Sequence, residues 1–173
     1  MSTVAGAGAG DVAPDPGQQA LLASDSAART MELGRLLGAC LRGGDIVLLS
    51  GDLGAGKTCL TQGIGAGLGV DSQVVSPTFV FMQVHAAADG RVLQHFDLYR
   101  LEHSEELEDI DYWGLLEGPA ISVVEWGDQF TDALPTGYLL VRIAVLDGGA
   151  RALECRAVGE RSRELLADWT GRL

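Results

Sequence analysis

Basic residues are scarce in this sequence, and lysine is almost absent. The 173 residues include 12 Lys and Arg against 24 Asp and Glu, a formal net charge of −12, and Lys57 is the only lysine. Because affinity for a nucleic-acid backbone comes from clustered cations, strong nucleic-acid binding by this chain alone is not expected. If nucleic acid is involved, a partner should hold it. The usual guanine-reading motif of regulatory GTPases, Asn-Lys-x-Asp, needs a second lysine; none exists here, which disfavours that class.

Cysteines are few, and long apolar runs are missing. Cys40, Cys59 and Cys155 are widely spaced and form no Cys-x-x-Cys pair. This argues against a disulfide framework and a zinc site and indicates reduced thiols. No run approaches the ~18 apolar residues of a membrane helix, and the first residues lack the basic and apolar regions of a secretory signal. We therefore expect a cytoplasmic protein that does not associate with membranes.

The length and composition predict one globular domain. A hydrophobic fraction of 47% over 173 residues is ordinary for a domain with its own core. Residues 1–20 are mostly Gly, Ala, Pro and Asp with little to bury, which predicts a disordered tail. The remaining residues, 21–173, are expected to form the single domain.

One glycine-rich stretch matches G-x-x-x-x-G-K-[ST], the phosphate-binding loop of nucleoside triphosphatases. Residues 46–50 before it predict a buried strand and residues 58–68 after it a helix, which is the context that the motif requires. A chance glycine-rich turn is the alternative in a chain with 24 glycines, but the only lysine stands here. The predicted nucleotide-binding residues are Gly51, Asp52, Leu53, Gly54, Ala55, Gly56, Lys57, Thr58 and Cys59.

The residue types of this loop each suit phosphate binding. The glycines allow backbone N–H groups to point at phosphate oxygens, and the helix N-terminus adds its positive end. Lys57 is expected on the β- and γ-phosphates and the Thr58 hydroxyl on Mg²⁺. Cys59 is interpreted as a small packed residue beside the loop rather than a redox switch.

The elements around this motif predict a mixed α/β sheet. A helix is expected from Ser24 or Ser26 to Leu41. Residues 80–84 and 92–96 predict a hairpin across the Asp89-Gly90 turn. Because a hairpin is not a βαβ unit, the sheet should contain antiparallel as well as parallel strands. Further strands are predicted at 120–124, 138–146 and 153–158, and a final helix at 162–169.

Two predicted strands end in carboxylates, at Asp97 and Glu125. An open α/β sheet binds its ligand at the carboxyl ends of its strands, and a phosphate loop needs a nearby acid to complete the Mg²⁺ shell. A helix cap or a salt bridge is the alternative for each acid. His95 lies on the same strand face as Asp97; a metal pair is conceivable, but a structural histidine bonded to a carboxylate is favoured.

Other residues carry weaker signals. Thr78, after Ser76-Pro77, could sense the γ-phosphate as switch threonines do, or simply belong to a turn. Arg100 could reach a phosphate as an internal arginine finger or pair with the acids that follow it. Trp126 could stack on a base or pack. The six acids of residues 102–111 are interpreted as a solvated helix face, with a docking face for a basic partner as the alternative.

Four motifs with this order and spacing resemble the TsaE (YjeE) family. They are residues 51–58, 76–79 (Ser-Pro-Thr-Phe), 95–101 (His-Phe-Asp-Leu-Tyr-Arg-Leu) and 124–126 (Val-Glu-Trp). The resemblance extends over about 24–158 and implies a three-layer P-loop α/β sandwich with a mixed, partly antiparallel sheet. It also implies a Mg²⁺-dependent ATPase in the bacterial biosynthesis of tRNA threonylcarbamoyladenosine (t6A).

The resemblance further implies partners and residue roles. The chain would act with a TsaB–TsaD pair, in which TsaD modifies an adenosine of tRNA, so tRNA would be met only through the partners. ATP or ADP and Mg²⁺ would be the bound small molecules. The implied roles are phosphate contact for Lys57, Mg²⁺ ligation for Thr58 and Glu125, turnover or coupling for Asp97 and Trp126, and a switch for Thr78. Arg151 resembles a family arginine near the nucleotide.

Two other functions remain open from the residues alone. A small P-loop metabolite kinase suits the size and the loop, but such kinases usually carry an arginine-bearing lid, and here the segment after Arg100 is acidic. A nucleotide-gated adaptor would bind partners without much turnover. For hydrolysis, we expect in-line attack of water on the γ-phosphate, with Lys57 and the loop amides stabilising the developing charge. Asp97 is the first choice for positioning the water, and Glu125 the second.

Overall fold

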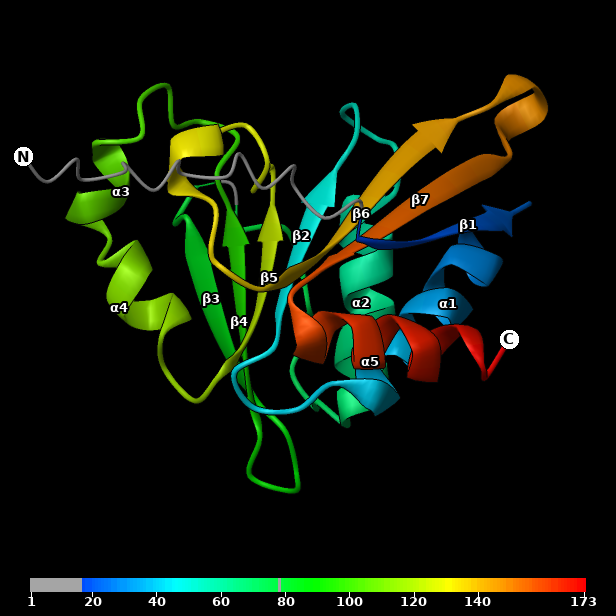
Figure 1. Cartoon of the computed structure of the whole chain (residues 1–173), viewed down its shortest axis with the longest axis horizontal. Helices are drawn as coiled ribbons and strands as arrows, with labels where there is room; N and C mark the ends of the chain where they lie inside the picture. The colour runs from blue at the N-terminus through cyan, green and yellow to red at the C-terminus, as the bar shows by residue number, and fades with distance from the viewer. Residues whose placement is uncertain (1–16, 78) are drawn as a thin grey trace, which may run out of the picture.

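A seven-stranded sheet forms the centre of the computed structural model, which describes residues 17–77 and 79–173 (Figure 1). The strands lie in the order β1-β7-β6-β2-β5-β4-β3. In chain order the elements are β1 (Gln18–Ser24), α1 (Ala27–Cys40), β2 (Ile46–Ser50), α2 (Lys57–Leu68), β3 (Met82–Ala86), β4 (Val92–Asp97), α3 (Glu106–Asp109), α4 (Tyr112–Leu116), β5 (Ile121–Glu125), η1 (Thr131–Ala133), β6 (Tyr138–Val145), η2 (Asp147–Gly149), β7 (Arg151–Val158) and α5 (Glu160–Thr170).

The sheet is mixed, as the sequence predicts. At its centre, β2 pairs in parallel with β5 and β6, and β5 pairs in parallel with β4. The outer pairs β3–β4, β6–β7 and β1–β7 are antiparallel. The predicted hairpin is the β3–β4 pair, with Gly90 at positive φ in its turn. The carboxyl ends of β2, β4 and β5 therefore lie at one edge of the sheet, directly beside the phosphate-loop motif.

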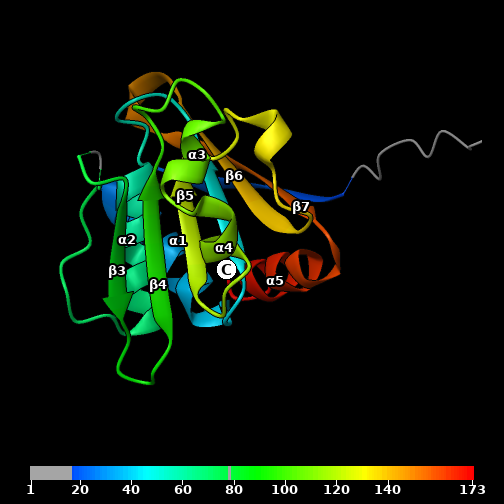
Figure 2. The same cartoon turned by 90° about the vertical axis from the view of Figure 1, so that its left-hand side faces the viewer.

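Helices cover the sheet on both faces, which confirms the three-layer α/β expectation (Figures 1 and 2). Alternate residues of the central strands enter two separate cores, because successive side chains of a strand point to opposite faces. On β2, Leu49 packs in the core with α1, α2 and α5, whereas Leu48 packs in the core with α3 and α4. In the part of the chain that the structure describes, no helix is long and apolar enough to span a membrane.

The helices α1 and α2 approach closely through glycines. A Cβ atom on Gly63 would lie 2.1 Å from the Met31 carbonyl oxygen, and one on Gly34 would lie 2.2 Å from the Leu60 carbonyl oxygen. Only glycine fits such backbone-to-backbone contacts without displacing a helix. Of the two serines predicted as possible caps of α1, Ser26 is the one that caps it. Its side chain accepts a hydrogen bond from the Arg29 N–H at 3.1 Å.

The first strand, β1, is not predicted by the sequence pattern. Gln18–Ala20, assigned to a disordered tail, belong to β1, which pairs with β7 from Gln18↔Ala157 to Ser24↔Arg151. The prediction of a disordered tail is therefore wrong for these residues. Residues 1–16 of the predicted tail lie outside the described part of the chain. The strand presents Leu22 to the core and leaves Leu21 70% exposed. Its stability comes from pairing with β7, which no local sequence pattern reveals.

Candidate functional site

The phosphate-loop motif lies between β2 and α2, as predicted. Its glycines adopt positive φ at Gly51, Gly54 and Gly56, a region that other residues rarely occupy. Gly51 is doubly constrained, because a Cβ there would lie 2.4 Å from the Ile143 carbonyl oxygen. Gly56 precedes α2 and no side chain caps this helix. The first N–H groups of α2 therefore remain available for an anion, which the positive end of the helix also favours.

Lys57 is folded onto the loop that carries it. Its Nζ donates hydrogen bonds to the carbonyl oxygens of Gly51 at 2.6 Å and Asp52 at 2.9 Å, and it lies 4.2 Å from the centroid of the Trp126 ring. Burial lowers the pKa of Lys57, and the nearby carboxylates of Glu125 and Asp97 oppose that shift. The ammonium is thus held at the cavity by weak neutral acceptors that a phosphate could replace.

Glu125 joins the loop to two strands. Its carboxylate accepts a hydrogen bond from the Thr58 hydroxyl, with oxygen–oxygen distances of 3.0 and 3.2 Å. On the other side, His95 Nε2 lies 2.9 Å from Glu125 Oε1. His95 is fully buried, and its Nδ1 has no hydrogen-bond partner among the described residues. His95 is therefore the carboxylate-bonded histidine favoured by the sequence, although its partner is Glu125 rather than Asp97.

Asp97 is fixed beside Glu125 by the strand register. The two residues are direct partners at the ends of β4 and β5. Asp97 is 4% exposed and accepts hydrogen bonds from the Ser76 hydroxyl and from the Tyr99 N–H at 3.0 Å. The carboxylate thereby ties the segment before Thr78 to the sheet edge. Thr78 itself lies outside the described residues.

A cavity of about 320 Å³ brings these groups together. The wall near Trp126 is aromatic, since its ring packs against Tyr99 with the centroids 5.1 Å apart. Trp126 also adopts a positive φ of 64°, which turns the chain sharply after β5. The lining residues are Leu53, Gly54, Gly56, Lys57, Thr58, Cys59, Ser76, Asp97, Tyr99, Glu125 and Trp126.

Two arginines differ in their relation to this cavity. Arg151, on β7, donates a hydrogen bond from its Nε to the Ala55 carbonyl oxygen at 2.9 Å. This bond holds the phosphate loop against β7. Arg100 does not line the cavity, and its guanidinium lies 4.4 Å from the centroid of the Phe79 ring. The arginine-finger alternative for Arg100 has no support in this conformation. The supporting contact of Arg151 could not be found from spacing, because it depends on β7 lying behind the loop.

The donor set suits a small hard cation. Mg²⁺ prefers oxygen ligands and commonly takes one or two from the protein, with phosphates and water completing its shell. The Thr58 hydroxyl and the Glu125 carboxylate offer such oxygens at the phosphate loop. No cluster of three or more His, Cys, Asp or Glu side chains that could hold a metal occurs among residues 17–77 and 79–173. A cation bound here would therefore depend on the nucleotide for most of its ligands.

Comparisons with known proteins show the family to which the chain is similar. Residues 24–153 match the family model described as threonylcarbamoyl adenosine biosynthesis protein TsaE. The TsaE of Streptomyces coelicolor is 46% identical over 136 residues, which cover 78% of this chain and 84% of that protein. The TsaE of a Nostoc species is 42% identical over 129 residues, covering 72% and 78%.

A solved structure extends the similarity to the fold. The crystal structure of Bacillus subtilis YdiB superposes with a TM-score of 0.75 and 28% sequence identity, covering 90% of this chain and 97% of YdiB. The match with the family model spans the phosphate loop, both strand-end carboxylates and Arg151. This chain belongs to the TsaE family of threonylcarbamoyl adenosine biosynthesis proteins.

Proposed function

We propose that this protein is the ATP-binding and ATP-hydrolysing component of the machinery that makes t6A in tRNA. One observation carries the proposal: the phosphate loop, its lysine and two strand-end carboxylates meet in one cavity. Membership of the TsaE family supplies the pathway, since relatives are named tRNA threonylcarbamoyladenosine biosynthesis proteins. The phosphate loop supplies the chemistry, because this arrangement of backbone N–H groups and lysine suits nucleoside triphosphates.

Nucleotide binding begins with the loop. The free N–H groups at the start of α2 and the Lys57 ammonium bind the phosphate oxygens. Lys57 leaves the carbonyl oxygens of Gly51 and Asp52 when it does so. The exchange favours the nucleotide, because a bond between two opposite charges is stronger than one to a neutral carbonyl.

A divalent cation fits beside the phosphates. Thr58 and Glu125 would hold Mg²⁺, which supplies positive charge at the phosphate oxygens when bound. His95 keeps the Glu125 carboxylate oriented from the protein side. A buried carboxylate with two fixed partners needs little reorganisation when it takes up a ligand.

Asp97 is proposed to position the attacking water. Its carboxylate lines the cavity, and the bonds from Ser76 and Tyr99 fix its orientation. In this position it can accept a hydrogen bond from water as the water attacks the γ-phosphate. Lys57 and the loop N–H groups stabilise the negative charge that develops.

The partners proposed for this ATPase are a TsaB–TsaD pair. The acidic composition, 24 Asp and Glu against 12 Lys and Arg, disfavours direct tRNA binding by this chain. A partner that holds the tRNA removes that difficulty. Exposed apolar side chains near the cavity mouth, Leu53 at 78% and Tyr99 at 48%, are available for contact with another protein.

The test is ATP hydrolysis by the purified chain, alone and with its own TsaB–TsaD pair. We expect the pair to stimulate turnover and Lys57→Ala to abolish nucleotide binding in both conditions. Arg156→Ala, which removes an exposed cation on β7 outside the cavity, is the matched control and should leave binding unchanged. If the pair neither stimulates hydrolysis nor co-elutes with the chain in ATP, the proposal fails, and phosphorylation of a metabolite becomes the activity to seek.

A further inference from the structure

A second and larger cavity lies at the opposite end of the parallel strands from the phosphate loop. Its volume is about 660 Å³, and it opens between α4 and the start of α5. The residues before or at the start of β2, β5 and β6 line it, whereas the phosphate loop follows the end of β2. Figure 2 shows α4 and α5 at this end of the molecule. We call this cavity the α4–α5 groove.

The floor of the α4–α5 groove is apolar. Its large side chains are Ile46, Trp113, Leu116, Leu134, Pro135 and Val158. Trp113 is 39% exposed, although its ring also packs against Tyr112 with the centroids 5.3 Å apart. An exposed indole beside aliphatic side chains is the kind of surface at which large apolar side chains of a partner bind tightly.

The rim of the groove carries negative charge that the protein does not neutralise. Asp45 is paired with Arg161, whose Nη2 lies 2.7 Å from Asp45 Oδ2, so these two charges cancel. Glu117 and Glu160 are exposed on the two sides of the groove. Neither carboxylate has a cation within ion-pair distance among the described residues.

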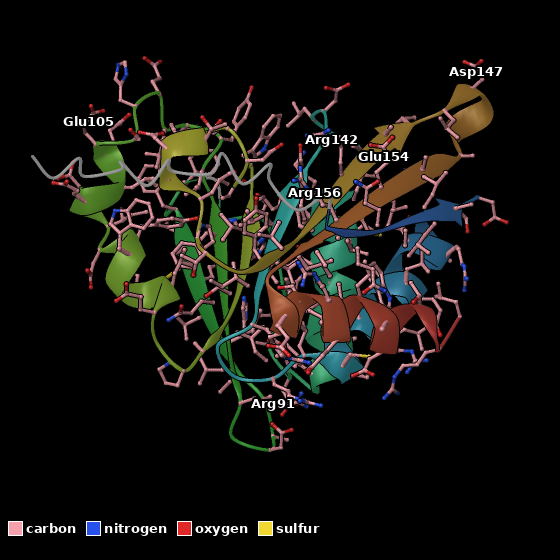
Figure 3. All side chains as sticks on the ribbon, viewed as in Figure 1. Arg91, Glu105, Arg142, Asp147, Glu154 and Arg156 are labelled. Atoms are coloured by element: carbon pink, nitrogen blue, oxygen red, sulfur yellow. The ribbon has the colours of Figure 1, made fainter. Side chains whose placement is uncertain are left out.

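The chain segment that contains α4 carries a large share of the protein's negative charge. Residues 101–141 contain ten acidic residues and no lysine or arginine, which accounts for most of the net charge of −12. This segment includes α3 and α4, and Glu105, which directly precedes α3, points outward in Figure 3. A surface with this potential repels phosphate backbones and other acidic proteins and attracts cations.

We propose that the α4–α5 groove binds a basic polypeptide segment of a partner protein. A large apolar side chain of the segment lies against Trp113 and Leu116, and flanking lysine or arginine side chains pair with Glu117 and Glu160. A second copy of this chain fits poorly, because two molecules of charge −12 repel one another. The groove lies away from the nucleotide cavity and shares no lining residue with it, so this docking does not depend on ATP hydrolysis.

The test uses three short labelled peptides and the full chain at low salt. One peptide alternates lysine with leucine, the second has glutamate in place of lysine, and the third has glycine in place of leucine. We expect measurable binding only for the lysine–leucine peptide, and its affinity should fall as the salt concentration increases. In the nuclear magnetic resonance spectrum, the indole N–H signal of Trp113 should move, while that of Trp169, bonded to the Leu33 carbonyl in the core, stays fixed.

Two double variants distinguish the effect of the groove carboxylates from the effect of the net charge of the protein. Glu117→Gln with Glu160→Gln should weaken binding about tenfold, which corresponds to about 1.4 kcal/mol. Asp147→Asn with Asp168→Asn removes the same charge outside the groove and should change affinity by less than about twofold. Figure 3 places Asp147 at the distant turn between β6 and β7. Nucleotide binding should be normal in both.

Three results would overturn this proposal. Equal weakening by both double variants would show that only the net charge matters. Equal binding of the glutamate–leucine peptide would show that the rim charge does not select the partner. A dimer of the chain that the lysine–leucine peptide dissociates would make a second copy the occupant instead.

Discussion

Glu125 is the residue on which the candidate nucleotide site depends most. Its carboxylate accepts a hydrogen bond from the Thr58 hydroxyl on α2 and lies beside His95 on β4. This one side chain of β5 therefore connects the phosphate loop to the strands β4 and β5. At 3% exposed, it would be costly to leave without partners. Because Glu125 serves both structure and the proposed cation, its substitution is a poor probe of chemistry. Asp97 is the better probe, since the donors to its carboxylate among the described residues are a loop hydroxyl and a backbone N–H.

We expect Asp97→Ala to retain nucleotide binding and lose turnover. The phosphate contacts come from Lys57 and the loop, and the substitution leaves them in place. Loss of a group that positions the nucleophile commonly costs about 10²–10⁴-fold in rate. The measurement is ATP affinity and hydrolysis in the presence of the partner pair.

Ser76→Ala is the matched control for Asp97. It removes one donor to the carboxylate but leaves the carboxylate itself, so a smaller loss of turnover is expected. If Asp97→Ala hydrolyses ATP at the normal rate, Asp97 does not position the water, and Glu125 becomes the candidate.

At the scale of elements, the contact between α1 and α2 sets the position of the phosphate loop. The helix α2 begins with Lys57, and its far side meets α1 through glycines rather than through larger side chains. Close helix contact of this kind leaves no room for relaxation, because backbone atoms lie on both sides. A shift of α2 would also move the N–H groups that are proposed to bind phosphate.

Gly63→Ala is therefore expected to destabilise the protein. The added Cβ would lie 2.1 Å from the Met31 carbonyl oxygen and 2.9 Å from the Gly34 Cα atom, so the helices must separate. Overpacking costs about 1–3 kcal/mol in free energy of unfolding, or roughly 2–4 °C in Tm for each kcal/mol at this chain length. Urea and thermal unfolding measure both quantities.

Gly137→Ala provides the comparison. The nearest atom to its added Cβ is the Val158 carbonyl oxygen at 3.6 Å, an ordinary contact. This variant should change the free energy of unfolding by less than about 0.5 kcal/mol. Similar stability of the two variants would contradict the close packing of α1 on α2.

At the scale of the whole molecule, a buried histidine links stability to pH. His85 on β3 is 4% exposed, its Nδ1 lies 2.7 Å from the Ser72 hydroxyl, and its Nε2 has no partner among the described residues. Burial lowers the pKa of His85 below its ordinary value of 6.5. The unfolded chain therefore binds a proton at a higher pH than the folded chain does.

The sign of the effect follows from that difference in pKa. As pH falls through about 6.5, the unfolded state takes up the proton first, so the free energy of unfolding decreases until the lower pKa of the folded state is reached. The decrease is at most about 1.4 kcal/mol for each pH unit in that window. His85→Asn should reduce this pH dependence, measured by urea unfolding between about pH 5 and 8.

The exposed His103 serves as the control for His85. His103→Asn should leave the pH dependence of unfolding as it is in the natural chain, because this substitution keeps the buried His85. An unchanged profile in His85→Asn would mean that the buried imidazole does not carry the effect.

Much of the fold could be predicted because its signals are local. The strand at 46–50, the loop at 51–58 and the helix after it follow from apolar periodicity, glycine conformation and one motif. The β3–β4 hairpin follows from its Asp-Gly turn. The strand β1 could not be predicted, since an edge strand of ordinary composition is stabilised by its neighbour β7 rather than by its own pattern.

By itself, the sequence determined which residues can carry chemistry: a lysine and a threonine in a phosphate loop, and carboxylates at the ends of two apolar strands. Only the tertiary structure decided how they meet. The bond between His95 and Glu125, the donors that fix Asp97 and the contact of Arg151 with Ala55 all join distant segments. These contacts depend on strand order and register, which follow from packing energies summed over the whole sheet and are not encoded in any single stretch of chain.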